Sequence, residues 1–164
     1  MTKTERLALP AESDLEASFS RNMPWLQRRL ALMLGDPEEA RDLAQEAFVR
    51  AVERWPIGSR DDVARWLATV GIRLAIDEIR RRRRWRFVIL HETDATWAIE
   101  TDPDLWNAIA RLEPAARAAL LLTVLDGYTQ DEVAAVLGVE RGTVASRLSR
   151  ARSRLRPVIQ ENDR

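Results

Sequence analysis

The sequence contains no cysteine and a single histidine, His91, among its 164 residues. Without cysteine the chain has no disulfide bond and no thiolate metal site. One histidine cannot build a histidine-based zinc site or a charge-relay triad, so the commonest catalytic constellations are missing. No apolar run reaches the roughly 18–20 residues that a membrane-spanning helix needs. The first residues lead into no signal-peptide core. We therefore expect a cytoplasmic protein that needs no metal and no cofactor and binds no membrane. These absences do not by themselves exclude an enzyme, but no catalytic pocket chemistry is visible in the sequence, so we expect no enzymatic activity.

An overall excess of charge is also lacking, because 26 basic residues balance 26 acidic ones. The distribution along the chain is uneven, however. Residues 1–90 hold 17 basic and 14 acidic side chains, and residues 105–164 hold nine and seven. Residues 91–104 hold five acidic side chains and neither lysine nor arginine. Two mildly basic blocks therefore flank an acidic connector, and such local patches matter more for partner choice than the net charge.

The segment from Thr129 to Leu148 has the pattern of a helix-turn-helix. Thr129 and Glu132 fit a capping box at the start of one helix. Gly138 supplies the turn, since glycine adopts positive φ at little steric cost. Apolar stripes at helical spacing on either side would let the two helices bury against each other, and these are Val133, Ala134 and Leu137, then Val139, Val144 and Leu148.

The outward face of the second helix is short or cationic, which suits a helix lying in the DNA major groove. The same pattern also fits an ordinary helical hairpin with solvated arginines. The arginine row that continues beyond it favours DNA, because guanidinium groups match phosphate geometry. The row comprises Arg147, Arg150, Arg152, Arg154 and Arg156.

Three further helices are predicted upstream. Apolar spacing indicates the first over residues 14–34, with Pro24 expected to break or kink it. Asp36 and Pro37 predict the start of the second, with Glu39 completing a capping box. Its apolar face includes Val52, while the opposite face is polar. A third helix is expected from about Val63.

This third helix ends in five consecutive arginines, residues 80–84, followed by Trp85 and Arg86. Five arginines exceed what a helix terminus requires, so contact with phosphates is favoured over a solvated helix end. No segment alternates as a strand does. The sequence thus predicts an all-α protein in two small helical domains, 14–86 and 105–164, with a loose end at 1–13 and an acidic linker at 87–104.

Three stretches, taken together, resemble the extracytoplasmic-function (ECF) sigma factors of the bacterial sigma-70 family. The helix starting at Asp36 is similar to the family's polymerase-binding helix, residues 64–84 to its promoter-opening helix, and residues 112–152 to its promoter-reading domain. The resemblance implies a dissociable specificity subunit of RNA polymerase. It implies contacts with the clamp of the β′ subunit, the flap of the β subunit and promoter DNA, and family members are commonly held by an anti-sigma factor.

The resemblance also implies roles for individual residues. Binding to the polymerase clamp falls to Asp42, Gln45, Glu46 and Arg50. Contact with the minus-10 element falls to Ser59, Arg60, Asp61, Trp66, Arg73, Arg80, Arg81, Arg83 and Arg84, where residues 59–62 form a loop around a flipped base and Trp66 stacks at the point of strand separation. Contact with the minus-35 element falls to Arg141, Thr143, Ala145, Ser146, Arg147, Ser149 and Arg150.

Three positions depart from what the family often has. Ala145 stands where lysine or arginine is frequent, Arg73 where asparagine is frequent, and Glu140 where proline, serine or threonine is frequent. These differences concern which promoter is recognised more than whether promoters are recognised.

Two other classes of protein compete with this interpretation. A stand-alone helix-turn-helix regulator would use the N-terminal half for dimerisation or sensing, which leaves the polar second helix and the arginine run without a joint purpose. A protein-interaction module that sequesters a sigma factor would not need two separated basic helix ends.

The acidic linker is hypothesised to thread a positively charged channel of the polymerase as a nucleic-acid mimic. Neutralising its carboxylates should then lower transcript yield from a reconstituted holoenzyme while leaving binding to core polymerase intact. The changes are Glu92→Gln, Asp94→Asn, Glu100→Gln, Asp102→Asn and Asp104→Asn. An unchanged yield in a run-off assay would rule the hypothesis out.

Overall fold

The computed structural model describes residues 12–54, 60–85 and 103–162, and within these ranges it contains seven helices and no strand. The all-α prediction is confirmed. The helices are α1 (Glu12–Leu34), α2 (Pro37–Glu53), α3 (Arg60–Trp85), α4 (Pro103–Ala110), α5 (Pro114–Leu125), α6 (Gln130–Leu137) and α7 (Arg141–Asn162).

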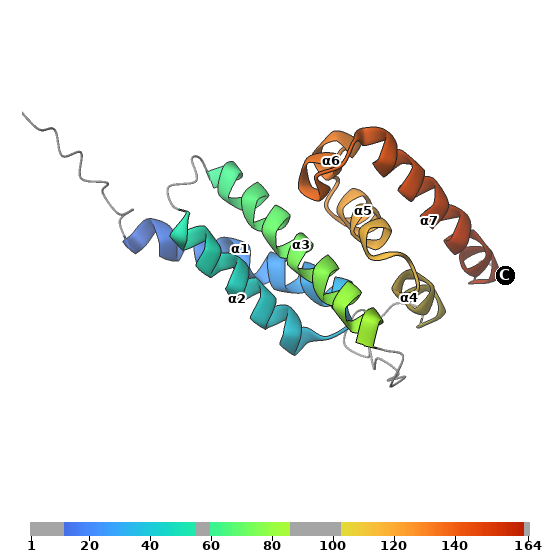
Figure 1. The fold of residues 1–164 in the computed structure, drawn as a ribbon, viewed down its shortest axis with the longest axis horizontal. Coiled ribbons are helices and arrows are strands. Elements are labelled where there is room, and N and C mark those ends of the chain that lie inside the picture. Colours follow the sequence, from blue (N-terminus) through green and yellow to red (C-terminus); the bar gives the residue numbers. More distant parts are fainter. Residues whose placement is uncertain (1–11, 55–59, 86–102, 163–164) are drawn as a thin grey trace, which may run out of the picture.

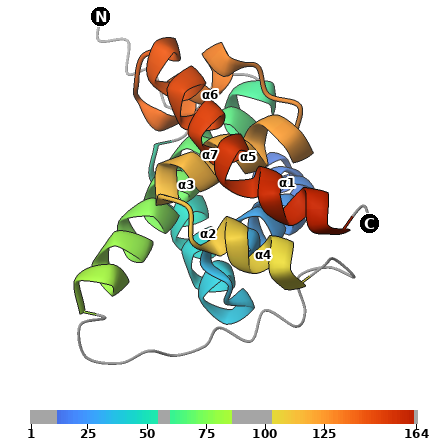
Figure 2. The same cartoon turned by 90° about the vertical axis from the view of Figure 1, so that its right-hand side faces the viewer.

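The helices form two groups that lie against each other (Figure 1). Helices α1, α2 and α3 all pack on one another, and α5, α6 and α7 do the same, with α4 against α7. The groups meet where α1 and α3 contact α5, and where α3 contacts α6. Helix α7 lies on the outside of the molecule, on the side away from α2 (Figure 2).

Helix α5 occupies the centre of this arrangement. Every residue from Pro114 to Leu122 is buried, including one arginine, Arg117. A helix that is apolar around its whole circumference is stable only when neighbours cover all its sides. Helices α1 and α3 cover one side of α5, and α6 and α7 cover the other.

Several helix boundaries differ from the sequence-based expectation. Pro24 lies inside the continuous helix α1, where burial of Met23, Leu26 and Leu30 outweighs the one missing backbone hydrogen bond. Helix α3 begins at Arg60, so the predicted loop at residues 60–62 is helical. Helix α4 begins at Pro103, which moves Asp104 from the expected linker into a helix.

The N-cap of α2 is Asp36, as predicted, whereas the side chain of Glu39 is paired with Arg82 of α3. Asp36 is the N-cap, and its Oδ1 atom accepts hydrogen bonds from the backbone N–H groups of Glu38 and Glu39. The side chain of Glu39 is ion-paired with Arg82 of α3. This contact links the start of α2 to the end of α3.

The helix-turn-helix forms as the sequence predicts. Thr129 Oγ1 accepts from the Glu132 backbone N–H at 3.3 Å, and Glu132 Oε2 accepts from the Thr129 backbone N–H at 2.8 Å. The hydrogen bonds that Glu132 Oε2 accepts from the Thr129 backbone N–H and from Thr129 Oγ1 lower the pKa of Glu132. Gly138 ends α6 in the left-handed region, with φ of 66° and ψ of 40°. Val133, Val144 and Leu148 are buried between the two helices.

The turn predicts opposite effects for two glycine-to-alanine changes. Gly138→Ala places a side chain at positive φ and should lower the free energy of unfolding by roughly 1 kcal/mol or more. Gly142→Ala is the control, because Gly142 lies inside α7 with open space around it. It should raise stability by about 0.5–1 kcal/mol. Urea denaturation followed by circular dichroism measures both, and equal stability of Gly138→Ala and the wild type would contradict the assignment.

Candidate DNA- and polymerase-binding surfaces

The predicted minus-35 residues share the outer part of α7. Arg141, Ala145, Ser146, Ser149 and Arg150 are exposed, and Thr143 and Arg147 are half-buried. The helix face is partly pre-ordered, because Arg150 Nε donates to the Ser146 carbonyl at 3.2 Å and Arg150 Nη2 donates to Ser146 Oγ at 3.2 Å. Helix α7 lies on the outside of the molecule (Figure 2), and the exposed Arg141 and Arg150 make its outer face cationic.

Two hollows flank this face of α7. One, of about 300 Å³, is lined by Thr143, Arg147, Arg150 and Arg154, with Glu113 at its edge. The other, of about 260 Å³, contains Ala145 and Ser149 together with Gln130 and Arg152. The short side chains at 145, 146 and 149 leave room for a nucleic-acid backbone or base edge, and the arginines supply positive charge on both sides.

The predicted minus-10 residues are distributed along α3 and do not form one open surface. Ser59 lies outside the described residues, and Arg60 and Asp61 occupy the first turn of α3. Trp66 is half-buried against the core of the protein. Arg81 is paired with Glu78 of its own helix at 2.7 Å, and Arg84 is exposed.

Three of the predicted minus-10 arginines contact the C-terminal part of the chain, in α6 and in the connection between α4 and α5. Arg73 Nε donates to the Val136 carbonyl at 3.0 Å, and Arg83 Nη2 donates to the Leu112 carbonyl at 2.8 Å. Arg80 Nη2 lies 3.4 Å from Glu113 Oε1. Sequence patterns could not reveal these contacts, because 29 to 63 residues separate the partners.

Arg82 differs from its four neighbours in the arginine run. It is ion-paired with Glu39, its Nε lies 3.1 Å from Glu78 Oε1, and its Nη2 lies 4.0 Å from Asp36 Oδ2. Arg82 thus fixes the end of α3 against the start of α2. Its neighbours are thereby held in a defined direction around the helix.

The predicted clamp-binding residues form an exposed stripe along α2, which comprises Asp42, Gln45, Glu46 and Arg50. Arg50 Nη2 lies 2.5 Å from Glu46 Oε1 within the stripe. Sequence analysis missed two apolar members of this surface. Val49 is 57% exposed and Val52 is 45% exposed, although Val52 was expected on the buried face. Exposed apolar side chains beside polar ones are typical of a protein-binding surface.

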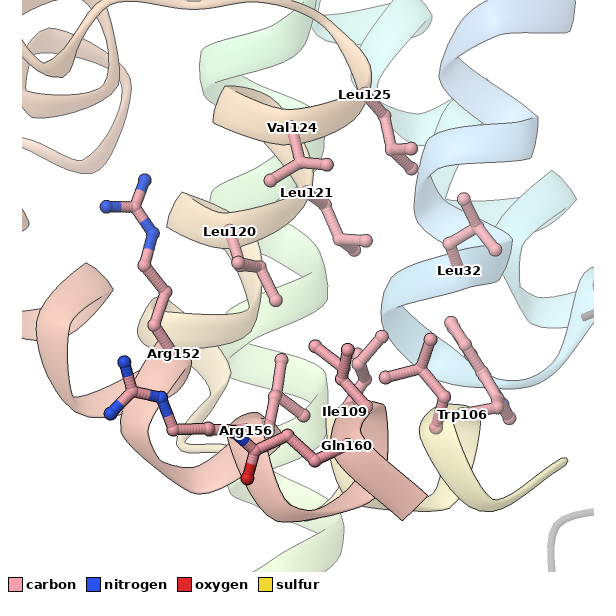
Figure 3. Close-up of a pocket in the computed structure, with 13 residues that line it drawn as sticks. Leu32, Trp106, Ile109, Leu120, Leu121, Val124, Leu125, Arg152, Arg156 and Gln160 are labelled. Atoms are coloured by element: carbon pink, nitrogen blue, oxygen red, sulfur yellow. The ribbon is translucent and has the colours of Figure 1, made fainter. Parts of the chain in front are cut away.

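An apolar groove of about 740 Å³ lies between α1, α4, α5 and α7. Figure 3 shows its lining, in which apolar side chains converge from all four helices and Arg152 and Arg156 stand at one rim. Val124 and Ile159 are 63% and 47% exposed there. A groove of this shape and polarity can receive the apolar side of a partner helix.

Arg117 bridges the two groups of helices from inside α5. Its side chain donates to the carbonyl groups of Met33, at the end of α1, and of Ala110, at the end of α4. Burial, and secondarily the nearby Arg83, lower the pKa of Arg117 to about 10, so the group is still charged at neutral pH. The C-terminal ends of α1 and α4 therefore share one buried cation. The C-terminal end of a helix carries a partial negative charge, which stabilises a cation placed there.

Comparison with known proteins identifies the class of this fold. Residues 19–85 match the family model for sigma-70 region 2, and residues 103–155 match the model for sigma-70 region 4. Sigma-70-type proteins are transcription initiation factors. In this class region 4 is the helix-turn-helix domain, as found here for α6 and α7.

Curated relatives define the family more closely. The chain is 33% identical to the ECF RNA polymerase sigma factor SigM of Mycobacterium tuberculosis over 86% of this chain and 74% of SigM. It is 30% identical to the RNA polymerase sigma factor CarQ of Myxococcus xanthus over 96% and 95%. It is 31% identical to SigE of Mycolicibacterium smegmatis, of which it spans 65%. The chain belongs to the ECF family of RNA polymerase sigma factors.

Two solved structures share the fold. One is the sigma factor RpoE in complex with the anti-sigma factor NepR from Bartonella quintana, with a TM-score of 0.69 and 23% identity over 90% of this chain and 98% of that one. The other is CnrH in complex with the cytosolic domain of CnrY, with a TM-score of 0.69 and 22% identity over 93% and 91%.

None of the helices in the described part of the chain is both long and apolar enough to cross a membrane. No group of three or more histidine, aspartate or glutamate side chains lies close enough there to hold a metal ion.

The bridging role of Arg117 predicts a large stability effect. Arg117→Met removes the donor from the carbonyl groups of Met33 and Ala110 and should lower the free energy of unfolding by about 1–3 kcal/mol. Arg117→Lys should recover only part of this loss, because one ammonium does not match the spread of a guanidinium. Arg111→Met, at an exposed arginine close by, is the control. Equal unfolding midpoints for the variants at positions 117 and 111 would contradict the role.

Proposed function

We propose that this chain is the specificity subunit that brings core RNA polymerase to promoters and starts transcription at them. It does so as a cytoplasmic protein with no catalysis of its own. In this proposal residues 14–86 bind core polymerase and open the minus-10 element, and residues 105–164 bind the minus-35 element. Residues 87–104 join the two parts, and residues 1–13 form a separate N-terminal segment.

The observation that favours this function over a stand-alone regulator is the α2 stripe. Asp42, Gln45, Glu46 and Arg50 are exposed around Val49 and Val52. A solvated helix face gains nothing from two exposed valines, whereas a protein interface gains apolar burial at its centre and hydrogen bonds around it. We assign this surface to the clamp of the β′ subunit.

The proposal assigns the other surfaces as follows. The outer face of α7 contacts the minus-35 element through Arg141, Thr143, Arg147 and Arg150, with Ala145, Ser146 and Ser149 admitting the DNA closely. Helix α3 contacts the minus-10 element through Trp66 and its arginines. The apolar groove beside α5 and α7 receives an apolar helix of the β flap.

An anti-sigma factor is a further partner in this proposal. The sigma factor RpoE, which shares this fold, is solved in complex with the anti-sigma factor NepR, and CnrH, which also shares it, is solved in complex with the cytosolic domain of CnrY.

Binding to core polymerase without DNA tests the proposal. The triple variant Asp42→Ala, Gln45→Ala, Arg50→Ala should bind purified bacterial core polymerase at least tenfold more weakly than the wild type, a loss of about 1.4 kcal/mol or more. The reason is that the variant removes polar partners around Val49 and Val52 without touching the core. Equilibrium titration of the fluorescently labelled chain measures the effect.

A variant of matched charge serves as the control. Arg28→Ala with Asp77→Ala removes one cation and one anion from exposed positions of α1 and α3, outside the stripe. It should bind core polymerase as the wild type does. If the wild-type chain fails to bind core polymerase yet binds duplex DNA, the chain is a stand-alone regulator and the proposal is wrong.

A further inference from the structure

The apolar groove between α1, α4, α5 and α7 has positive charge at one rim and no negative charge in its lining. Its volume of about 740 Å³ is in the range of small-molecule binding sites. The described residues that line it are all apolar except Arg152, Arg156 and Gln160. A ligand that matches this lining has an apolar body and an anionic group at one end.

The apolar part of the groove is open to solvent. Val124, Leu125 and Ile159 line it and are exposed. Figure 3 shows Leu32 and Trp106 on the side of the groove opposite the two arginines, so the apolar surface extends away from the charged rim. Covering this surface with an alkyl chain removes apolar area of both partners from water.

The charge at the rim is available to a ligand. Arg152 and Arg156 lie four positions apart on α7, so their side chains are neighbours on the helix surface. Both are exposed, and within the described part of the chain neither is paired with a carboxylate. A guanidinium group binds a carboxylate through charge-assisted hydrogen bonds. Two guanidinium groups at this rim can therefore bind one carboxylate without first breaking an existing ion pair.

We propose that the groove is a binding site for a long-chain fatty acid. The alkyl chain lies along Val124, Leu125 and Ile159, and the carboxylate binds Arg152 and Arg156. The proposed function assigns the same groove to an apolar helix of the β flap, so bound fatty acid excludes that helix and weakens binding to core polymerase. This competition rests on the proposed function, whereas the binding of the fatty acid does not.

Calorimetric titration of the full-length chain tests the site without polymerase. Dodecanoate, kept below the concentration at which it forms micelles, should bind with saturation and a stoichiometry of one. Decanoate should bind up to about tenfold more weakly, because two fewer methylene groups are buried. Dodecyltrimethylammonium has the same alkyl chain with a cationic head, so it should bind at least tenfold more weakly than dodecanoate.

Two variants locate the ligand in the groove. Arg152→Gln with Arg156→Gln should bind dodecanoate at least tenfold more weakly, because the carboxylate loses both partners. Val124→Asp places a like charge in the apolar part and should weaken binding to a similar degree. All three positions are exposed, so the changes leave the core intact, and circular dichroism checks the fold.

A control of matched charge accompanies the arginine variant. Arg28→Gln with Arg154→Gln also removes two exposed cations, but neither residue lines the groove. Arg154 lies on the same helix α7, which makes it a close comparison for position 152 or 156. This control should bind dodecanoate as the wild type does.

The competition is measured by titrating the labelled chain with core polymerase. Saturating dodecanoate should weaken binding of the wild type at least threefold. It should have little effect on the variant Arg152→Gln with Arg156→Gln, which separates the groove from any effect of the fatty acid on polymerase itself.

Three results would overturn the fatty-acid site. The first is the absence of saturable dodecanoate binding, and binding to vesicles of phosphatidylglycerol in its place would indicate a membrane surface instead. The second is equal binding of dodecanoate and dodecyltrimethylammonium. The third is unchanged dodecanoate binding in both groove variants.

The polymerase titration separates the remaining outcomes. Dodecanoate binding with unchanged affinity for core polymerase would refute the competition and leave the site. A chain that binds dodecanoate but not core polymerase would contradict the proposed function and likewise leave the site.

Discussion

The structure depends on helix α5, which is apolar on all sides and must be shielded from solvent around its whole circumference. From Pro114 to Leu122 every residue of α5 is buried, and α1 and α3 provide one half of the cover. At about 25 cal/mol per Å² of apolar surface, covering such a helix dominates the association of the two groups of helices. Several apolar packings of the two groups would have nearly the same free energy, and the polar contacts between the groups select one register among them.

These polar contacts share one chemical pattern. Arg73, Arg83 and Arg117 each donate to backbone carbonyl groups of the other helix group, so that no carboxylate has to be buried with them. A carbonyl at the end of a helix already carries a partial negative charge. Among the described residues, the ion pair of Arg29 with Asp126 is the contact between the two groups that uses a buried carboxylate, and it is also where several buried polar atoms have no hydrogen-bond partner. The weakest place in the interface is thus at one end of α5.

Local signals in the sequence predicted the local structure well. The capping box of Thr129 and Glu132, the N-cap at Asp36 and the turn at Gly138 each involve residues within a few positions of one another. Apolar spacing also identified the buried stripe of α6 and α7. Pro24 was misjudged because helix propensity is a weak constraint where tertiary burial is large.

What the sequence could not supply were pairings between distant residues. Arg73, Arg80 and Arg83 were predicted to face DNA from their charge and spacing alone. Nothing local indicates that their nearest oxygens belong to residues 112, 113 and 136. The sequence also did not predict that Val52 is exposed. An apolar residue at the edge of a helical stripe can lie either in the core or on the surface, and only the packing of the neighbouring helices decides between the two. The roles of individual site residues remain predictions, made from motif position.

The fully buried α5 has a consequence for the life of the protein in the cell. When the two groups of helices separate, the side of α5 that faced α1 and α3 becomes accessible, next to the already exposed Val124 and Leu125. Chaperones and proteases recognise such newly exposed apolar segments. We therefore expect the separated chain to be short-lived unless another protein covers it at once. Its abundance would then follow the supply of partners as well as its rate of synthesis.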